Sequence, residues 1–201
     1  MTYIVDRDQH SLFASRSKGP TAPDLMSVIY IVTTGGTIEK TYSETDGSVL
    51  NAQNKLERYL AKLRRPGIET YIVPLMNKDS LEMSDEDRRL LLGIMKGLLV
   101  ECAPVVITHG TDTMVETGLY LKQNLPEVHV PIILTGAMTP LGFEDSDGLQ
   151  NLTESLFAVR LVPAGLYIVM HGRVFPVDHV RKDHKLAQFV WADPPVSPKV
   201  Q

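Results

Sequence analysis

The sequence predicts an α/β fold in which a mostly parallel sheet is covered by helices on both faces. From Ser27 onward, short β-branched apolar runs alternate with longer segments of helical periodicity, a pattern typical of repeated βαβ units. The apolar runs lack regular polar positions, so neither face of these strands is expected to meet solvent. A chain of 201 residues is long enough to bury one sizeable core.

Five strands are expected, at residues 28–33, 69–75, 104–108, 130–135 and 165–170. Pro104 and Pro131 stand at strand starts, where a missing backbone N–H does least harm. Residues 27–191 are expected to form a single domain. Residues 1–26, rich in Ser, Gly and Pro, are expected to be a disordered arm, and the proline-rich residues 192–201 an extended tail.

Four segments between the strands show apolar residues at helical spacing. The first carries Leu56, Tyr59, Leu60 and Leu63, and the second carries Leu90, Leu91, Ile94 and Leu98 behind the capping signature Ser84-Asp85-Glu86-Asp87. A third helix is expected to begin near Thr113, with Glu116 as its capping partner. The fourth covers residues 147–161, with Leu149, Leu152, Leu156 and Val159 facing inward.

Composition and charge exclude several function classes. The net charge of −4 and a pI near 5.9 leave no basic surplus for a phosphate backbone or an anionic membrane surface. No stretch approaches the ~20 apolar residues that span a bilayer, and the first 26 residues lack the apolar core of a secretory signal, so a cytoplasmic protein is expected. The single cysteine, Cys102, lies in an apolar run and is expected to be buried by packing.

Polar and glycine-rich loops follow the predicted strands, and in a doubly wound sheet such loops share one crevice. The first four are Thr33-Thr34-Gly35-Gly36-Thr37-Ile38-Glu39-Lys40, Asn77-Lys78-Asp79-Ser80-Leu81-Glu82-Met83, Thr108-His109-Gly110-Thr111-Asp112-Thr113-Met114 and Thr135-Gly136-Ala137-Met138-Thr139-Pro140. The fifth strand leads towards Arg181-Lys182-Asp183.

These loops contain the parts of a threonine-based hydrolytic site. A threonine hydroxyl is a poor nucleophile unless a base is positioned beside it and backbone amides stabilise the oxyanion. Glycines beside Thr37 let backbone N–H groups approach an anion, and Thr111, Asp112 and Lys182 can form a proton-handling set. Taken singly, each has a structural explanation: Asp112 can cap a helix, and Lys182 can be a surface lysine.

Other chemistries have less support. There is no Gly-x-Ser-x-Gly elbow, phosphate loop or dinucleotide fingerprint, so neither a serine nucleophile nor a nucleotide cofactor is expected. His171, His179 and His184 lack the spacing of a metal site, and no metal is expected. His109 is expected to be a packing or loop residue.

The motifs Thr-Gly-Gly-Thr-Ile, Thr-His-Gly-Thr-Asp-Thr-Met and Thr-Gly-Ala-Met, in this order, resemble those of the bacterial-type L-asparaginase (asparaginase/glutaminase) family. With Asp145-Ser146-Asp147-Gly148 and Asn151, the similarity covers residues 27–189. The resemblance implies the flavodoxin-like, three-layer N-terminal domain of that family. It also implies an acyl-enzyme mechanism with no metal or organic cofactor.

The resemblance assigns roles to individual residues. Thr37 matches the nucleophile, while Thr111, Asp112 and Lys182 match the set that assists proton transfer. Ser80 matches the residue that binds the α-carboxylate of the substrate, and Asp112 also holds its α-amino nitrogen. Tyr42 matches a tyrosine on a loop over the site, although it lies nearer to the first threonine than in longer enzymes. The other residues expected to contact substrate are Gly36, Asp79, Gly110 and Ala137.

Three departures from the family pattern bear on the substrate. The smaller C-terminal domain, which supplies a carboxylate to a neighbouring subunit, is missing from this sequence, so it resembles the compact, single-domain members. Leu81 stands where longer enzymes have a polar residue that grips the substrate. Glu39 and Lys40 replace small residues after the first motif.

The expected function is hydrolysis of L-asparagine to L-aspartate and ammonia by a homo-oligomer, a dimer or tetramer, with no nucleic-acid or membrane partner. Two alternatives stay open. One is an ammonia-supplying subunit similar to the asparaginase-like component of an amidotransferase. The other is a non-catalytic module that binds an amino acid.

Overall fold

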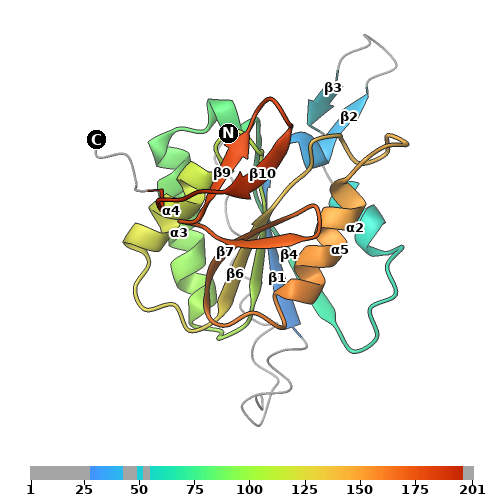
Figure 1. Ribbon diagram of the computed structural model, residues 1–201. Coiled ribbons are helices and arrows are strands. Elements are labelled where there is room, and N and C mark those ends of the chain that lie inside the picture. Colours follow the sequence, from blue (N-terminus) through green and yellow to red (C-terminus); the bar gives the residue numbers. More distant parts are fainter. Residues whose placement is uncertain (1–27, 43–48, 52–54, 197–201) are drawn as a thin grey trace.

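A six-stranded sheet lies at the centre of the computed structural model, which describes residues 28–42, 49–51 and 55–196 (Figure 1). The expected arm at residues 1–26 and residues 197–201 of the expected tail lie outside the described residues. The strands are β1 (Val28–Gly35), β2 (Lys40–Tyr42), β3 (Val49–Asn51), β4 (Glu69–Lys78), β5 (Val105–Thr108), β6 (Pro131–Thr135), β7 (Gly165–Met170), β8 (Arg173–Pro176), β9 (Val180–Asp183) and β10 (Gln188–Trp191). The helices are α2 (Lys55–Leu60), α3 (Asp85–Leu99), α4 (Met114–Asn124) and α5 (Gly148–Ala158), with short 3₁₀ turns η2 (Thr37–Glu39) and η3 (Ser80–Glu82).

The strand order in the sheet is β4-β1-β5-β6-β7-β8. All neighbouring strands pair in parallel except β8, which runs antiparallel to β7. The chain passes from β1 outward to β4 and returns on the other side of β1 with β5, so the order reverses between β1 and β5. In open α/β sheets, ligands bind beyond the carboxyl ends of the strands at this reversal. The predicted α/β fold with a mostly parallel sheet is therefore confirmed.

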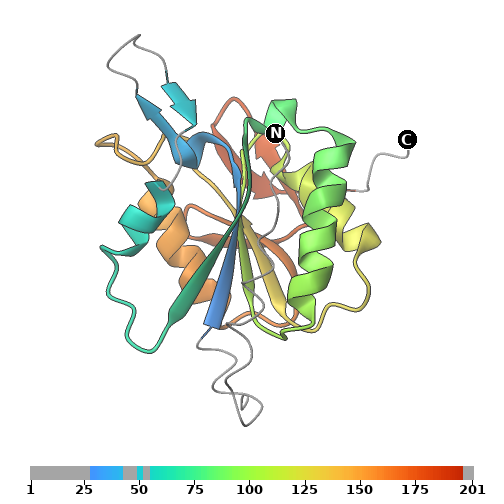
Figure 2. The ribbon, with the colours of Figure 1, turned by 180° about the vertical axis from the view of Figure 1, so that it is seen from behind.

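Two hydrophobic cores cover the two faces of the sheet, because successive side chains of a strand point to opposite faces. Along β1, Tyr30 and Val32 belong to the core under α3 and α4, whereas Ile29 and Ile31 belong to the core under α2 and α5. Figure 2 shows the two helix pairs on opposite sides of the sheet. The central strands are buried on both faces, which explains their continuous apolar sequence.

Two small hairpins, β2–β3 and β9–β10, lie at the same end of the sheet, the end where the parallel strands terminate (Figure 1). The sequence analysis did not predict either hairpin. The β9–β10 hairpin is anchored by Phe189, which is buried in the core under α3 and α4. This anchor fixes the position of Lys182, which pairs with Phe189 across the hairpin.

Three details of the helices differ from the prediction. The capping box of α3 forms between Ser84 and Asp87, but Leu90 is 52% exposed, because the inward stripe runs through the next position of the helix. Helix α2 ends at Leu60, before Leu63. The Thr113 hydroxyl makes no cap with Glu116 and instead donates to the backbone carbonyl of the η3 turn.

The expectation that Cys102 packs in the core is wrong. This residue lies in the turn after α3, with a positive φ of 51°, and its side chain is exposed. The helix ends before the apolar run does, so the cysteine falls outside the periodic stripe. Within the described ranges, no helix has the length and apolar character that a bilayer span requires.

Candidate active site

Thr37 lies in a tight glycine turn at the carboxyl end of β1. Gly35 and Gly36 both adopt positive φ angles, 97° and 80°, which favour glycine. The Gly36 amide donates to the Lys78 carbonyl oxygen at 2.8 Å, which ties the turn to the end of β4. A Cβ on Gly36 would lie 2.4 Å from the Gly110 nitrogen, so glycine is needed for this turn to pack against the loop after β5. Thr37, half-buried, therefore sits beside that second loop.

The second loop carries Thr111 and Asp112, and both contact Lys182. The Lys182 Nζ donates to the Thr111 Oγ1 at 2.7 Å and lies 2.7 Å from the Asp112 Oδ1. The side chain of Lys182 is 12% exposed and Thr111 is buried, so little water competes for this contact. The structure thus brings together three predicted site residues that lie on two separate segments of the chain.

The third part of the site is the η3 turn after β4. The Asp79 carboxylate accepts hydrogen bonds from the Leu81 amide at 3.1 Å and from the Lys40 Nζ at 2.7 Å, and the bond from Lys40 holds the pKa of Asp79 below its ordinary value. Ser80 is buried, and its hydroxyl has no partner within the described part of the chain. A Cβ on Gly110 would lie 2.5 Å from this oxygen. A buried hydroxyl without a partner is available to a ligand.

Ala137 is buried in the loop after β6, and Asp147 holds this loop in place. The Asp147 carboxylate accepts hydrogen bonds from the amides of Met138 and Thr139, each at 2.9 Å. Burial raises the pKa of Asp147, but the bonds from the two amides, together with those from His171 and Asn151, outweigh it and keep the pKa below its ordinary value. Its side-chain partners are Asn151 and His171. The sequence analysis noted Asp147 within a motif but gave it no role.

Glu39 is a buried carboxyl two positions after Thr37, at the end of η2. The Thr108 hydroxyl donates to the Glu39 Oε1 at 3.3 Å. Burial raises the pKa of Glu39 from 4.5 to about 7, and the hydrogen bond from Thr108 works in the opposite direction. The sequence analysis recorded Glu39 only as a departure from a family pattern.

Two residues at this edge point into solvent. Tyr42 lies on the β2–β3 hairpin and is 54% exposed, and none of the contacts above involves it. Leu81 is 72% exposed and offers no polar group to a ligand beside Ser80.

His109 is the histidine that lies in one of the site loops. His109 is completely buried, its Nδ1 lies 2.7 Å from the Gly110 carbonyl oxygen, and burial lowers its pKa to about 4, so the ring is neutral. In residues 28–42, 49–51 and 55–196, no three His, Cys, Asp or Glu residues gather closely enough to hold a metal ion.

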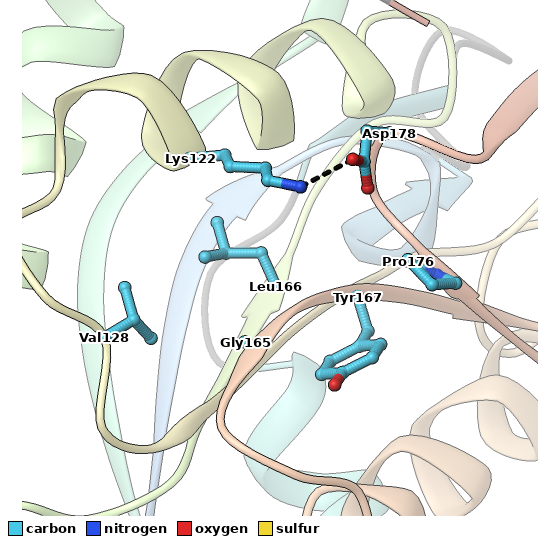
Figure 3. A pocket seen from close by; sticks show the side chains of 7 residues that line it. All are labelled: Lys122, Val128, Gly165, Leu166, Tyr167, Pro176 and Asp178. Carbon is cyan, nitrogen blue, oxygen red and sulfur yellow. Dashed lines mark hydrogen bonds and ion pairs between the residues drawn. The ribbon is translucent and has the colours of Figure 1, made fainter. Parts of the chain in front are cut away.

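A separate hollow of about 290 Å³ lies at the other end of the strands, beside the first residues of β7 (Figure 3). It is lined by Lys122, Val128, Gly165, Leu166, Tyr167, Pro176 and Asp178. The two charged residues of this group pair with each other at 2.6 Å. The hollow contains none of the predicted site residues, and its charges are already neutralised.

The burial of Glu39 predicts an uncommon pH dependence of stability. Because its pKa is about 7 in the folded chain and 4.5 ordinarily, the folded state binds more protons than the unfolded state between these values. The free energy of unfolding contributed by this group therefore falls as the pH rises from about 4.5 to about 7. Glu39→Gln, which stays neutral, is expected to gain up to roughly 3 kcal/mol of stability relative to the unaltered protein between pH 4.5 and pH 8.

Urea unfolding at several pH values measures this difference. Glu101→Gln, a change at an exposed carboxyl, is the matched control and is expected to show no such trend. A stability difference for Glu39→Gln that is the same at every pH would contradict the prediction.

Comparisons with known proteins point to one family. Residues 28–193 match the family described as "Asparaginase, N-terminal". L-asparaginase 1 of Escherichia coli is 30% identical over 181 residues, which cover 86% of this chain and 52% of that protein. The solved L-asparaginase of Thermococcus kodakarensis aligns with a TM-score of 0.76 at 26% identity, over 84% of this chain and 52% of that one.

A shorter stretch of the chain is similar in sequence to a different kind of protein. One component of the glutamyl-tRNA(Gln) amidotransferase of Methanococcus vannielii is 41% identical over 70 residues, which cover 35% of this chain and 16% of that protein. The chain spans about half the length of the asparaginases that it matches.

Proposed function

The chain belongs to the asparaginase family, and from this premise we propose that it hydrolyses L-asparagine to L-aspartate and ammonia through a covalent intermediate on Thr37. The observation that carries the proposal is the contact of the Lys182 ammonium with both the Thr111 hydroxyl and the Asp112 carboxylate. This group of three side chains lies on and beside the loop that packs against the glycine turn before Thr37. Three polar side chains joined in this way can pass protons between them. A site that only binds a ligand has less need of such a proton-transfer set.

In the first half of the proposed reaction, the Thr37 hydroxyl oxygen attacks the side-chain amide carbon of asparagine. Its proton passes through the Thr111 hydroxyl to the Lys182 nitrogen, while the ammonium passes one of its own protons to the Asp112 carboxylate with which it is paired. Backbone N–H groups of the glycine turns stabilise the resulting oxyanion. That proton returns along the same path to the amide nitrogen, the C–N bond breaks, ammonia leaves, and an aspartyl ester remains on Thr37.

In the second half, water attacks the ester carbon and gives its proton to the same Thr111 and Lys182 pair. The bond to the Thr37 oxygen breaks, the hydroxyl regains a proton, and aspartate is released. Asp112 positions Lys182 between these steps, since in the resting site the two groups form an ion pair at 2.7 Å.

The substrate is held at its backbone end by groups that the structure leaves available. The buried Ser80 hydroxyl, without a partner in the described chain, suits the α-carboxylate. The Asp112 carboxylate, about one-third exposed, suits the α-ammonium. Leu81 adds no hydrogen bond, so we expect weak binding and a high KM.

The substrate ranking tests this account. Ammonia release is expected from L-asparagine, with some turnover of D-asparagine because the α-amino contacts are few. L-glutamine should have a kcat/KM at least about tenfold lower, since one extra methylene displaces its amide carbon from Thr37. Equal kcat/KM values for asparagine and glutamine would show that the pocket does not position the amide as proposed.

The same assay separates the two alternatives. Preference for glutamine, together with co-elution with a larger partner, would favour an ammonia-supplying role, the possibility raised by the local amidotransferase match. Calorimetric binding of asparagine without ammonia release would favour a binding module.

We also infer that residues 27–191 form the working domain in the cytoplasm and assemble as a homo-oligomer. The exposed side chains of Tyr42 and Leu81 at the rim of the site support assembly, because a neighbouring copy would cover them. Light scattering after size-exclusion chromatography measures the assembly, and a monomer at working concentration would remove this part of the proposal.

A further inference from the structure

Glu39 is a buried carboxyl inside the site that the proposed reaction does not use. Its backbone amide donates to the Gly36 carbonyl oxygen at 3.1 Å, so it belongs to the same turn as Thr37. Its side chain contacts Thr108, the last residue of β5. Thr108 in turn accepts a hydrogen bond at its carbonyl oxygen from the Thr34 hydroxyl of β1, at 2.8 Å. The Glu39 carboxyl therefore joins the nucleophile turn to the strand that leads into the Thr111 loop.

The titratable groups around this turn are engaged with other partners. Lys40 pairs with Asp79, Lys182 pairs with Asp112, Lys55 of α2 donates to the Lys40 carbonyl oxygen, and the neutral His109 bonds the Gly110 carbonyl oxygen. The two lysines of the site thus balance its two aspartates. Among these described groups, none gives Glu39 an opposite charge, and its side-chain partner is the neutral hydroxyl of Thr108.

We propose that Glu39 is a positioning residue that fastens the Thr37 turn to the end of β5, and that its neutral carboxyl is the form that supports turnover. This inference rests on the proposed function, in which Thr37 is the nucleophile. The contact with Thr108 survives in both protonation states, because a hydroxyl donates to a carboxylate and accepts from a carboxylic acid.

The charge balance of the site explains why the neutral form is favoured. An oxyanion develops during attack by Thr37, and the substrate brings a carboxylate of its own. An ionised Glu39, buried two positions from Thr37 and without an opposite charge, would repel both in a region of low dielectric. The neutral carboxyl keeps the hydrogen bond and removes the repulsion.

The test compares the unaltered protein with Glu39→Gln and Thr108→Val by measuring kcat/KM for L-asparagine from pH 6 to pH 8.5. Since the pKa of Glu39 is about 7, about one-tenth of the molecules are neutral at this position at pH 8. The ratio of Glu39→Gln to the unaltered protein is expected to be near one at pH 6 and to rise about tenfold by pH 8. The Thr108 hydrogen bond lowers the pKa of Glu39. In Thr108→Val, the midpoint of the fall in kcat/KM with rising pH should therefore shift to a higher pH.

A Glu39→Gln ratio that stays constant with pH would overturn the inference, since a purely structural role predicts a uniform loss. An unchanged midpoint in Thr108→Val would overturn it as well. Glu101→Gln serves as the control for removing an exposed carboxyl.

A second measurement needs no turnover and therefore separates this inference from the proposed function. NMR titration follows the side-chain carboxyl carbon of Glu39 and the backbone amide of Thr37. The coupling is supported if both signals titrate with the same midpoint and the titration of the Thr37 amide is lost in Glu39→Gln. This result does not depend on whether asparagine is hydrolysed. Different midpoints, or a Thr37 amide that titrates equally in the variant, would overturn it.

Discussion

Thr37→Ala is expected to lower the rate of ammonia release from L-asparagine by at least about a thousandfold. The alanine variant lacks the oxygen that forms the acyl bond, so only the binding and electrostatic parts of catalysis remain. Its fold should persist, because Gly36 and its packing against Gly110 hold the turn through backbone atoms rather than through the Thr37 side chain. Steady-state ammonia release and thermal unfolding of the same preparation measure the two effects separately.

Thr37→Ser is the matched control for this change. It keeps the hydroxyl and loses one methyl group from a half-buried side chain, so it should retain measurable turnover. A Thr37→Ala protein with more than about one-tenth of the original activity would show that another group attacks the amide. The proposed mechanism would then be wrong, although the family assignment would stand.

The fold was largely predictable because its strands carry a strong local signal. The central strands are buried on both faces, which requires unbroken apolar runs, and all five predicted strands are present. The β9–β10 hairpin was missed because its strands are four residues long and half-polar. Such strands look like loop sequence, and their position is set by the burial of Phe189 rather than by local propensity.

The helix details show where local patterns stop being reliable. Leu90 and Cys102 both belong to apolar runs, yet both are exposed. At Leu90 the spacing allowed more than one inward stripe, and packing decided which residues face inward, whereas Cys102 lies in the turn beyond the end of α3. Thr113 forms a bond with the η3 turn instead of a cap, because a tertiary partner was available.

The site was predictable where a residue's role follows from its place at a strand end. Thr37, Thr111 and Asp112 follow β1 and β5, the strands on either side of the point where the strand order reverses, and Ser80 follows the neighbouring strand β4. The contact of Lys182 with Thr111 depends on the β9–β10 hairpin, and only the structure shows it. Glu39 needed the structure for a different reason, because its burial and its bond to Thr108 cannot be read from its sequence neighbours.

Lys182→Met is expected to lower kcat by about a hundredfold to ten-thousandfold, the range of a lost proton-transfer group. The ammonium is the donor to Thr111 and the ion-pair partner of Asp112, so its removal leaves the Thr111 hydroxyl without its described side-chain partner. Thr111→Val removes the other half of the same contact and should cause a loss of similar size. Lys185→Met, at an exposed position of the same hairpin, removes an equal charge and should keep nearly full activity.

The double variant Lys182→Met with Thr111→Val gives the sharper result. If the two side chains form one proton path, either single substitution already removes the whole contribution of that path. The double variant should then lose no more kcat than the slower of the two single variants. Effects that multiply would mean that Lys182 and Thr111 act independently, and the 2.7 Å contact between them would then not carry the proton. The cycle needs only kcat values from the four proteins, measured at one pH with saturating L-asparagine. Because a fold defect would also depress activity, the urea midpoint of each protein is measured alongside.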